Sequence, residues 1–174
     1  MIAKSYILKD LKTIDALYKK ATSPKKHLFY SKLAIIELCG WIEMTMDDIV
    51  LSSAKHHVKV SSNSKWVEDD LVGRIYGFTY KDHFRKMLRG YVGIACLELL
   101  EAKLDSLKFA RMVSQLSALK IVRDPAAHTH LKGVAATLDA PSVTLSRFTH
   151  IYEGLKDIDT NLRRYKSKAS FLTQ

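Results

Sequence analysis

The chain has 174 residues, of which 47% are apolar and 26% are charged, an ordinary profile for one globular domain spanning residues 1–174. Its 28 basic and 18 acidic residues give a net charge of +10, which is spread along the chain and favours a polyanionic partner. With two cysteines and no charged tail, the composition excludes a disulfide scaffold and a basic nucleic-acid-binding arm.

A cytoplasmic protein is predicted from what the sequence lacks. No run approaches about 18 apolar residues, the length that a membrane-spanning helix needs, so no membrane association is expected. Residues 1–5 also lack the apolar segment of a signal peptide. Cys39 and Cys96 lie far apart in apolar helical patterns, so we interpret each as a small buried hydrophobe in a reducing compartment.

The N-terminal half reads as helix with one polar interruption. Apolar residues at helical spacing predict a first helix over residues 3–21, and the sequence after Ser23-Pro24 predicts a longer one over residues 28–51. Residues 52–64 are rich in Ser and Lys and are predicted to be a polar linker, in which His56 and His57 are exposed rather than bound to a metal. A short helix is then expected over residues 65–75.

The C-terminal half predicts three further helices. Two long ones cover residues 82–104 and 105–122, and a last one follows the polar turn at residues 139–142. No strand-type alternation, internal repeat or glycine-rich phosphate loop interrupts this pattern. The predicted fold is therefore all-α, an antiparallel helical bundle of four to five main helices plus short helices.

Carboxylates on the second long helix are candidates for a supporting role. By helical spacing Glu37, Trp41 and Asp48 fall near one face, and Glu43 lies off it. The Glu-x-x-His pattern of di-iron bundles is absent, so no metal site is predicted. These carboxylates are expected to be solvated or to pair with a helix end, with the alternative that one of them holds an arginine or histidine of a site.

A lysine cluster near the first interhelical turn is the densest basic feature of the sequence. We interpret it as a solvated helix face, with a nucleic-acid-binding track as the alternative. The cluster consists of Lys9, Lys12, Lys19, Lys20, Lys25 and Lys26.

The stretch Arg123-Asp124-Pro125-Ala126-Ala127-His128 places a cation, a carboxylate and an imidazole close together. Arginine can neutralise a phosphate and histidine can transfer a proton near neutral pH, the parts needed to cleave RNA without a metal. Because a residue before proline avoids helical geometry, we predict that the fourth helix ends near Arg123. Asp124 would then cap a new helical turn whose free N–H groups face a phosphate.

Two alternatives accompany this interpretation. The stretch can be a capped kink between two bundle helices, with Arg123 on the surface and His128 bonded to a carbonyl. His130 is a second candidate for the imidazole, because it is close to Arg123 in sequence and does not share a helix face with His128. The shorter spacing favours His128. His27, His83 and His150 have no nearby partner in sequence and are predicted to be structural.

With these residues in place, the chain resembles the HEPN superfamily. That family carries an Arg-x4–6-His pattern between helices, with a polar residue directly after the arginine. Arg123, Asp124 and His128 match the pattern here, and Glu37 or Glu43 is a candidate for the acidic residue of the family's early helix. Residues 52–64 and the short helix after them have no assignable counterpart.

The resemblance implies a metal-independent endoribonuclease that needs no cofactor. Two copies would form a homodimer with their motifs facing one cleft, where His128 moves a proton, Arg123 stabilises the phosphate and Asp124 orients either one. The products would be a 2′,3′-cyclic phosphate and a 5′-hydroxyl. By analogy, such a protein acts as a toxin or phage-defence effector, with an antitoxin or nucleotidyltransferase-like partner.

Two other classes of function stay open. In one, the domain is a non-catalytic HEPN-like module whose Arg123 holds a nucleotide or RNA phosphate. In the other, it is a protein-interaction bundle, and Arg-Asp-Pro is only a helix break.

Overall fold

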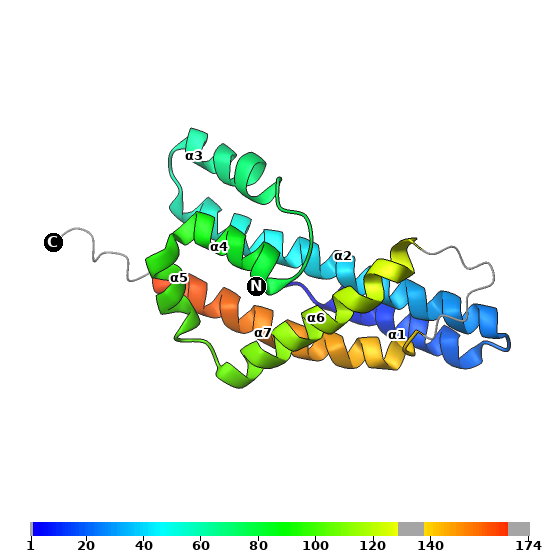
Figure 1. Cartoon of the computed structure of the whole chain (residues 1–174). Coiled ribbons are helices and arrows are strands. Elements are labelled where there is room, and N and C mark those ends of the chain that lie inside the picture. The colour runs from blue at the N-terminus through cyan, green and yellow to red at the C-terminus, as the bar shows by residue number, and fades with distance from the viewer. Residues whose placement is uncertain (1, 129–137, 167–174) are drawn as a thin grey trace.

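A computed structural model describes residues 2–128 and 138–166, and every regular element in these two ranges is helical, which confirms the predicted all-α bundle. Four long helices form the bundle, with α1 and α6 running in one direction and α2 and α7 in the other (Figure 1). They are α1 (Ser5–Lys20), α2 (Pro24–His57), α6 (Ser106–His128) and α7 (Pro141–Lys166).

Between α2 and α6 the chain forms a row of short elements beside the bundle (Figure 1). These are α3 (Ser61–Trp66), the π-helical turn η1 (Val67–Val72), the π-helical turn η2 (Tyr80–Phe84), α4 (Arg85–Val92) and α5 (Ile94–Glu101). η1 and α4 both pack on α2, while α5 packs on α7.

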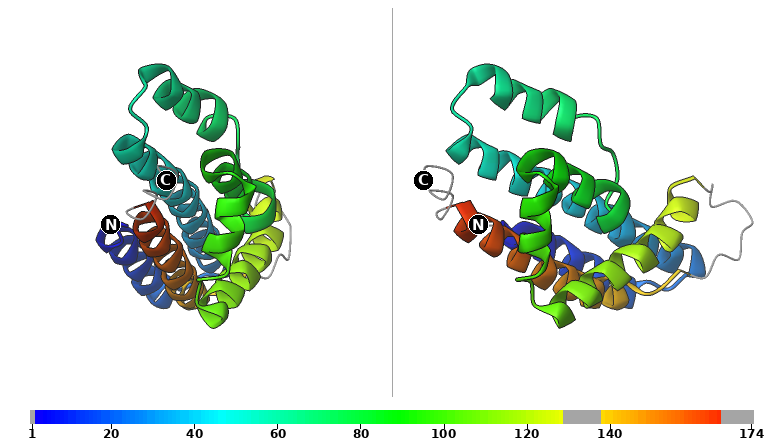
Figure 2. Two further views of the ribbon diagram at one scale, coloured as in Figure 1. Left: turned by 90° about the vertical axis from the view of Figure 1, so that its left-hand side faces the viewer. Right: turned by 60° about the vertical axis from the view of Figure 1, so that its left-hand side comes forward.

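The core is built around α2, which packs against α1, α6 and α7. In Figure 2 the left-hand view shows α1 and α6 on either side of α2. Trp41 of α2 is buried, donates its indole N–H to the carbonyl oxygen of Ala3 at 3.1 Å, and meets the ring of Phe148 of α7 edge-on at 5.1 Å. Among the described helices, none combines the length and the apolar composition required to cross a bilayer.

The predicted linker over residues 52–64 is wrong, because helix covers most of that segment. α2 continues to His57 and α3 begins at Ser61. Ser53 and Ala54 are buried, so the polar-looking sequence is the last turns of an amphipathic helix with small residues on its inner face. His56 and His57 are exposed, as predicted, but on a helix.

The predicted helix over residues 82–104 is broken into two helices at Gly93. Gly93 has φ +80°, a conformation that side chains other than glycine's rarely adopt, so α4 ends before it and α5 begins after it. The helix also starts earlier than predicted, in the π-helical turn η2.

The predicted helix break at Arg123 is wrong as well. α6 begins after Asp105, whose carboxylate accepts hydrogen bonds from the backbone N–H groups of Leu107 and Lys108, and it continues through Pro125 to His128. Pro125 removes one N–H whose partner would be the carbonyl of Ile121, and both residues are exposed, so water can satisfy that carbonyl. Asp124 is therefore not an N-cap, and no helix begins beside it.

Candidate functional site

Arg123 lies in a cavity of about 340 Å³ that is built by three separate segments of the chain. α2 contributes Glu43, the turn before η2 contributes an aromatic wall, and α6 contributes cations and a carboxylate. We call it the Arg123 cavity. Its lining consists of Glu43, Tyr76, Gly77, Phe78, Thr79, His83, Lys120, Arg123 and Asp124.

The guanidinium of Arg123 is held on three sides. Its Nη1 donates to the carboxylate of Asp124 at 3.1 Å, and its Nη2 donates to Glu43 at 3.4 Å. The guanidinium carbon lies 5.6 Å from the ring centre of Phe78, within the range of a cation–π contact. The side chain keeps 31% of its surface exposed, so the cation is fixed in place and still reachable by a ligand.

His83 also lines the cavity, and a local hydrogen-bond pattern holds its ring. Its Nδ1 lies 3.1 Å from the backbone nitrogen of Thr79 and 2.7 Å from the Thr79 hydroxyl. The far edge of the ring packs on Gly77, where a Cβ would lie only 2.5 Å from Nε2. Gly77 has φ +123°, so glycine is required there both for the backbone conformation and for space.

The wall that carries His83 is tied to the rest of the molecule by Glu101 of α5. Glu101 accepts a 2.6 Å hydrogen bond from the Tyr80 hydroxyl and a bidentate pair from Arg85 at 2.7 and 2.9 Å. The Tyr80 ring also meets Phe109 of α6 edge-on at 4.8 Å. Tyr80 and Arg85 flank His83 in sequence, so the Glu101 contacts hold this segment against α5, and the Phe109 contact links it to α6.

Burial and nearby charge shift the titration of groups around the cavity. Burial lowers the pKa of His83 below its ordinary value, and Lys120 and Lys86 lower it further against the opposing charge of Asp82, so the ring is neutral at neutral pH. On α2, burial and the negative charge of Glu43 raise the pKa of Asp47 to about 6.

The thiol of Cys39 is unreactive. Cys39 is buried, and this burial raises its pKa to about 12, so it stays a protonated, apolar group as its sequence context predicts. Cys96 is half-buried, and both thiols are free.

Of the residues predicted from the sequence, the structure brings Arg123, Asp124 and Glu43 together. Glu37 is exposed on α2 and is not among the residues that line the cavity. His128 is the last residue of α6, and its side chain lies outside the described part of the chain. His130 lies outside the described residues altogether. Within the two described ranges, no cluster of three or more His, Cys, Asp or Glu side chains is arranged to hold a metal.

His83 is the residue that sequence reasoning missed, because its partners are distant in sequence. Arg123 is brought to it only by the packing of α6 against the row of short elements. The sequence does contain one local indication of how the His83 ring is held. Thr79 is the N-cap of η2 and His83 lies four residues later, a spacing that lets a side chain reach back to the N-cap backbone.

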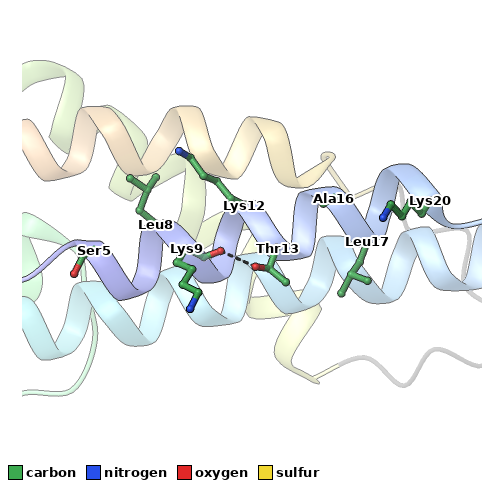
Figure 3. Close-up of a pocket in the computed structure, with 8 residues that line it drawn as sticks. All are labelled: Ser5, Leu8, Lys9, Lys12, Thr13, Ala16, Leu17 and Lys20. Carbon is green, nitrogen blue, oxygen red and sulfur yellow. Dashed lines mark hydrogen bonds between the residues drawn. The ribbon is translucent and has the colours of Figure 1, made fainter.

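A second, shallower depression of about 630 Å³ lies along one side of α1 (Figure 3). We call it the α1 face. Leu8, Ala16 and Leu17 form its apolar floor, and all its lining residues belong to α1. The rest of the lining is Ser5, Lys9, Lys12, Thr13 and Lys20. Its described lining residues include basic groups but no carboxylate or imidazole, the side chains that most often transfer a proton at neutral pH.

Comparisons of the chain with models of known protein families, with curated proteins and with solved structures give no match.

Proposed function

We propose that this protein is a metal-independent endoribonuclease of the HEPN kind, as its Arg123–His128 stretch suggests. The observation that carries the proposal is the fixed yet reachable guanidinium of Arg123, held by Glu43, Asp124 and Phe78 at the wall of a cavity. An arginine that only covered the surface would not need three partners from three segments. A positioned cation is what a phosphate needs when charge builds on it during cleavage.

The reaction is an internal displacement at phosphorus. The ribose 2′-oxygen attacks, the O2′–P bond forms and the P–O5′ bond breaks, leaving a 2′,3′-cyclic phosphate and a 5′-hydroxyl. One proton leaves the 2′-hydroxyl and one joins the 5′-oxygen, and His128 transfers at least one of them. Arg123 stabilises the negative non-bridging oxygens. DNA is inert because it lacks the 2′-hydroxyl.

A second copy of the chain completes the site in this proposal. Supporting it is an exposed apolar stripe on α2 formed by Phe29, Ile36 and Met44, which are spaced seven and eight residues apart and so share a helix face. Met44 is 62% exposed and directly follows Glu43 in sequence. Burying this stripe against its copy would bring two Arg123 cavities towards one cleft.

The biological setting rests on analogy alone. A toxin or defence role, restrained by an antitoxin or a nucleotidyltransferase-like partner, follows from the HEPN resemblance and from no contact described above.

The first experiment is cleavage of a labelled single-stranded RNA in EDTA by the wild type, Arg123→Ala and His128→Ala. We expect the wild type to cut and both variants, with unchanged circular dichroism, to lose at least about 100-fold in rate. If the wild type binds RNA without cutting it and Arg123→Ala does not bind, the protein is a non-catalytic binding module. Loss of wild-type activity in EDTA would overturn the metal-free mechanism.

The second experiment tests the homodimer by light scattering coupled to size exclusion. Met44→Glu should convert a dimer into a monomer, because a charge on the stripe cannot be buried without a partner. Leu99→Glu is the matched control, since Leu99 is a similarly exposed apolar residue (52%) on α5, away from the stripe. A wild-type monomer, or equal dimerisation of both variants, would contradict the α2 interface.

A further inference from the structure

The lining of the Arg123 cavity includes an aromatic side chain that is not packed in the hydrophobic core. Tyr76 lies in the turn before η2 and is 81% exposed, although it lines the cavity together with Phe78, Lys120 and Arg123. An exposed ring next to cations is the combination with which proteins bind unpaired bases, because the ring stacks on the base and the cations hold the backbone.

The hydrogen bonds of His83 fix which ring nitrogen can serve a ligand. The backbone N–H of Thr79 can only donate, so Nδ1 of His83 accepts at 3.1 Å and carries no proton. The neutral ring then has its proton on Nε2, the nitrogen that packs beside Gly77 in the same cavity. Lys86, Lys120 and Asp82 are the charged groups around the ring, and with burial their net effect keeps it neutral. His83, which lines the cavity, therefore carries an Nε2–H donor and is not a base.

The charges and the size of the cavity narrow the class of ligand. Among the described residues of the lining, the charges of Lys120 and Arg123 are balanced by those of Glu43 and Asp124. Such a site suits the single negative charge of a phosphodiester better than the two or more charges of a terminal phosphate. A volume of about 340 Å³ is at the small end of ligand pockets, enough for one nucleotide and too small for a duplex.

We propose that the Arg123 cavity takes one unpaired internal nucleotide of a single-stranded RNA. Its base stacks on Tyr76, its phosphodiester lies at Lys120 and Arg123, and His83 donates its Nε2–H to that nucleotide. This inference rests on the proposed function for the identity of the polymer, and it adds the substrate class and two binding residues, Tyr76 and His83.

The test separates binding from cleavage by using a 2′-O-methyl single-stranded RNA, which lacks the attacking hydroxyl. Its affinity is measured by fluorescence anisotropy, with a perfectly paired hairpin of the same length as the competitor. Tyr76→Ala should weaken binding by about tenfold or more, the effect of losing one stacked base, and Tyr76→Phe should stay close to the wild type. Thermal melting of each variant confirms that it is folded.

His83 is tested with a pair of variants and a pH series. His83→Ala should weaken binding several-fold, whereas His83→Gln, which keeps an N–H donor, should recover part of the loss. Because the pKa of His83 lies below its ordinary value and the ring is neutral at neutral pH, wild-type affinity should stay flat from about pH 8.5 to about pH 7. Binding that tightens steadily over that range and loses its pH dependence in His83→Ala would show a titrating imidazole and overturn the assigned role.

The outcomes distinguish the two proposals. If the wild type binds the 2′-O-methyl RNA through Tyr76 but leaves natural RNA intact, the ribonuclease proposal fails and the nucleotide site stands. If the wild type cuts RNA while folded Tyr76→Ala and His83→Ala bind and cut like it, the nucleotide site fails and the ribonuclease proposal stands. Equal affinity for the hairpin and the single strand would also overturn the site.

Discussion

The Arg123 cavity and the α1 face both carry exposed cations, but they differ in what fixes those cations. In the cavity, Arg123 is held by groups from α2, from the turn before η2 and from its own helix. On the α1 face, Lys9, Lys12 and Lys20 project from one helix. Positive charge therefore attracts a polyanion from either surface, whereas catalysis requires a cation whose position is fixed beforehand.

The two surfaces also lie on different sides of α2. By helical spacing, Glu43 and Asp47 share one side of this helix, and Thr45, Ile49 and Ser52 share the opposite side. The latter three line a small depression together with Tyr6 of α1. α1 therefore covers the side of α2 that faces away from the Arg123 cavity, so variants on one surface do not disturb contacts on the other and can be compared directly.

The largest difference between the surfaces is expected from a charge-preserving substitution. Arg123→Lys keeps the positive charge, but an ammonium group cannot donate to both Glu43 and Asp124 while lying over the ring of Phe78. We therefore expect the rate of RNA cleavage to fall about 100-fold. The matched change on the α1 face is Lys12→Arg, for which no loss is expected. Single-turnover rates with RNA measure both. Comparable rates for Arg123→Lys and the wild type would mean that charge alone suffices in the cavity.

A second prediction tests how the cavity wall is built. Gly77→Ala should destabilise the protein by about 1–3 kcal/mol, because its φ of +123° is strained for alanine and the new Cβ would meet the ring of His83. Gly93→Ala is the control, since Gly93 also has a positive φ but open space around its Cβ position. Both should lower the melting temperature, and only Gly77→Ala should weaken RNA binding.

A double-mutant cycle isolates the clash from the backbone strain. In the His83→Ala background the ring is gone, so Gly77→Ala should cost clearly less than it does in the wild type. Equal costs in both backgrounds, measured by denaturant unfolding, would show that the ring of His83 is not packed on Gly77 in solution.

A third prediction concerns Asp47, which lies beside Glu43 on the cavity side of α2. Its folded-state pKa of about 6 lies above the ordinary 3.8, so the folded protein binds the proton more tightly than the unfolded chain. The free energy of unfolding should therefore fall as pH rises through that window and stay reduced above it. Asp47→Asn removes the carboxyl and with it this loss of stability at high pH.

We expect Asp47→Asn to stabilise the protein by about 1 kcal/mol at about pH 7.5, less than the roughly 3 kcal/mol of the full shift because the side chain keeps some contact with water. The gain should shrink as pH falls and vanish at about pH 3, where the carboxyl is protonated in both the folded and the unfolded state. Thermal melting at the two pH values measures it. Asp48→Asn is the control on the same helix, and an equal gain for it would point to the net charge of α2 as the cause.

The long helices were predictable because their apolar residues repeat at helical spacing. Ile7, Leu11 and Ile14 of α1 are buried as their pattern indicates, and so are Phe148 and Leu155 of α7. Helix ends were less predictable. α2 was expected to start at residue 28 but begins at Pro24, where Ser23 caps it by accepting a hydrogen bond from the backbone N–H of Lys26.

The errors have different physical causes. Pro125 reads as a helix break, but its position on an exposed face lets α6 continue. Only part of the candidate site could be predicted from the sequence. Arg123 and Asp124 could be found because they are neighbours in sequence, and Glu43 could be named as a candidate. That His83 lines the same cavity as Arg123 follows only from the folded structure.

The smallest effect on RNA affinity is expected from substitutions on the α1 face. The salt dependence of that affinity distinguishes the α1 face from the Arg123 cavity. Each lysine in contact with a phosphate contributes about 0.7 to the slope of log affinity against log salt for a single strand. Lys120→Gln, within the cavity, should lower that slope by about this amount. The triple variant of Lys9, Lys12 and Lys20 to Gln should leave the slope unchanged and weaken binding about threefold at most, since these lysines act only through the long-range field. RNA affinity measured at several salt concentrations shows whether the lysines of the α1 face contact phosphates. A slope that falls by about 2 in the triple variant would place RNA on the α1 face, and the bound strand would then have to pass around α2.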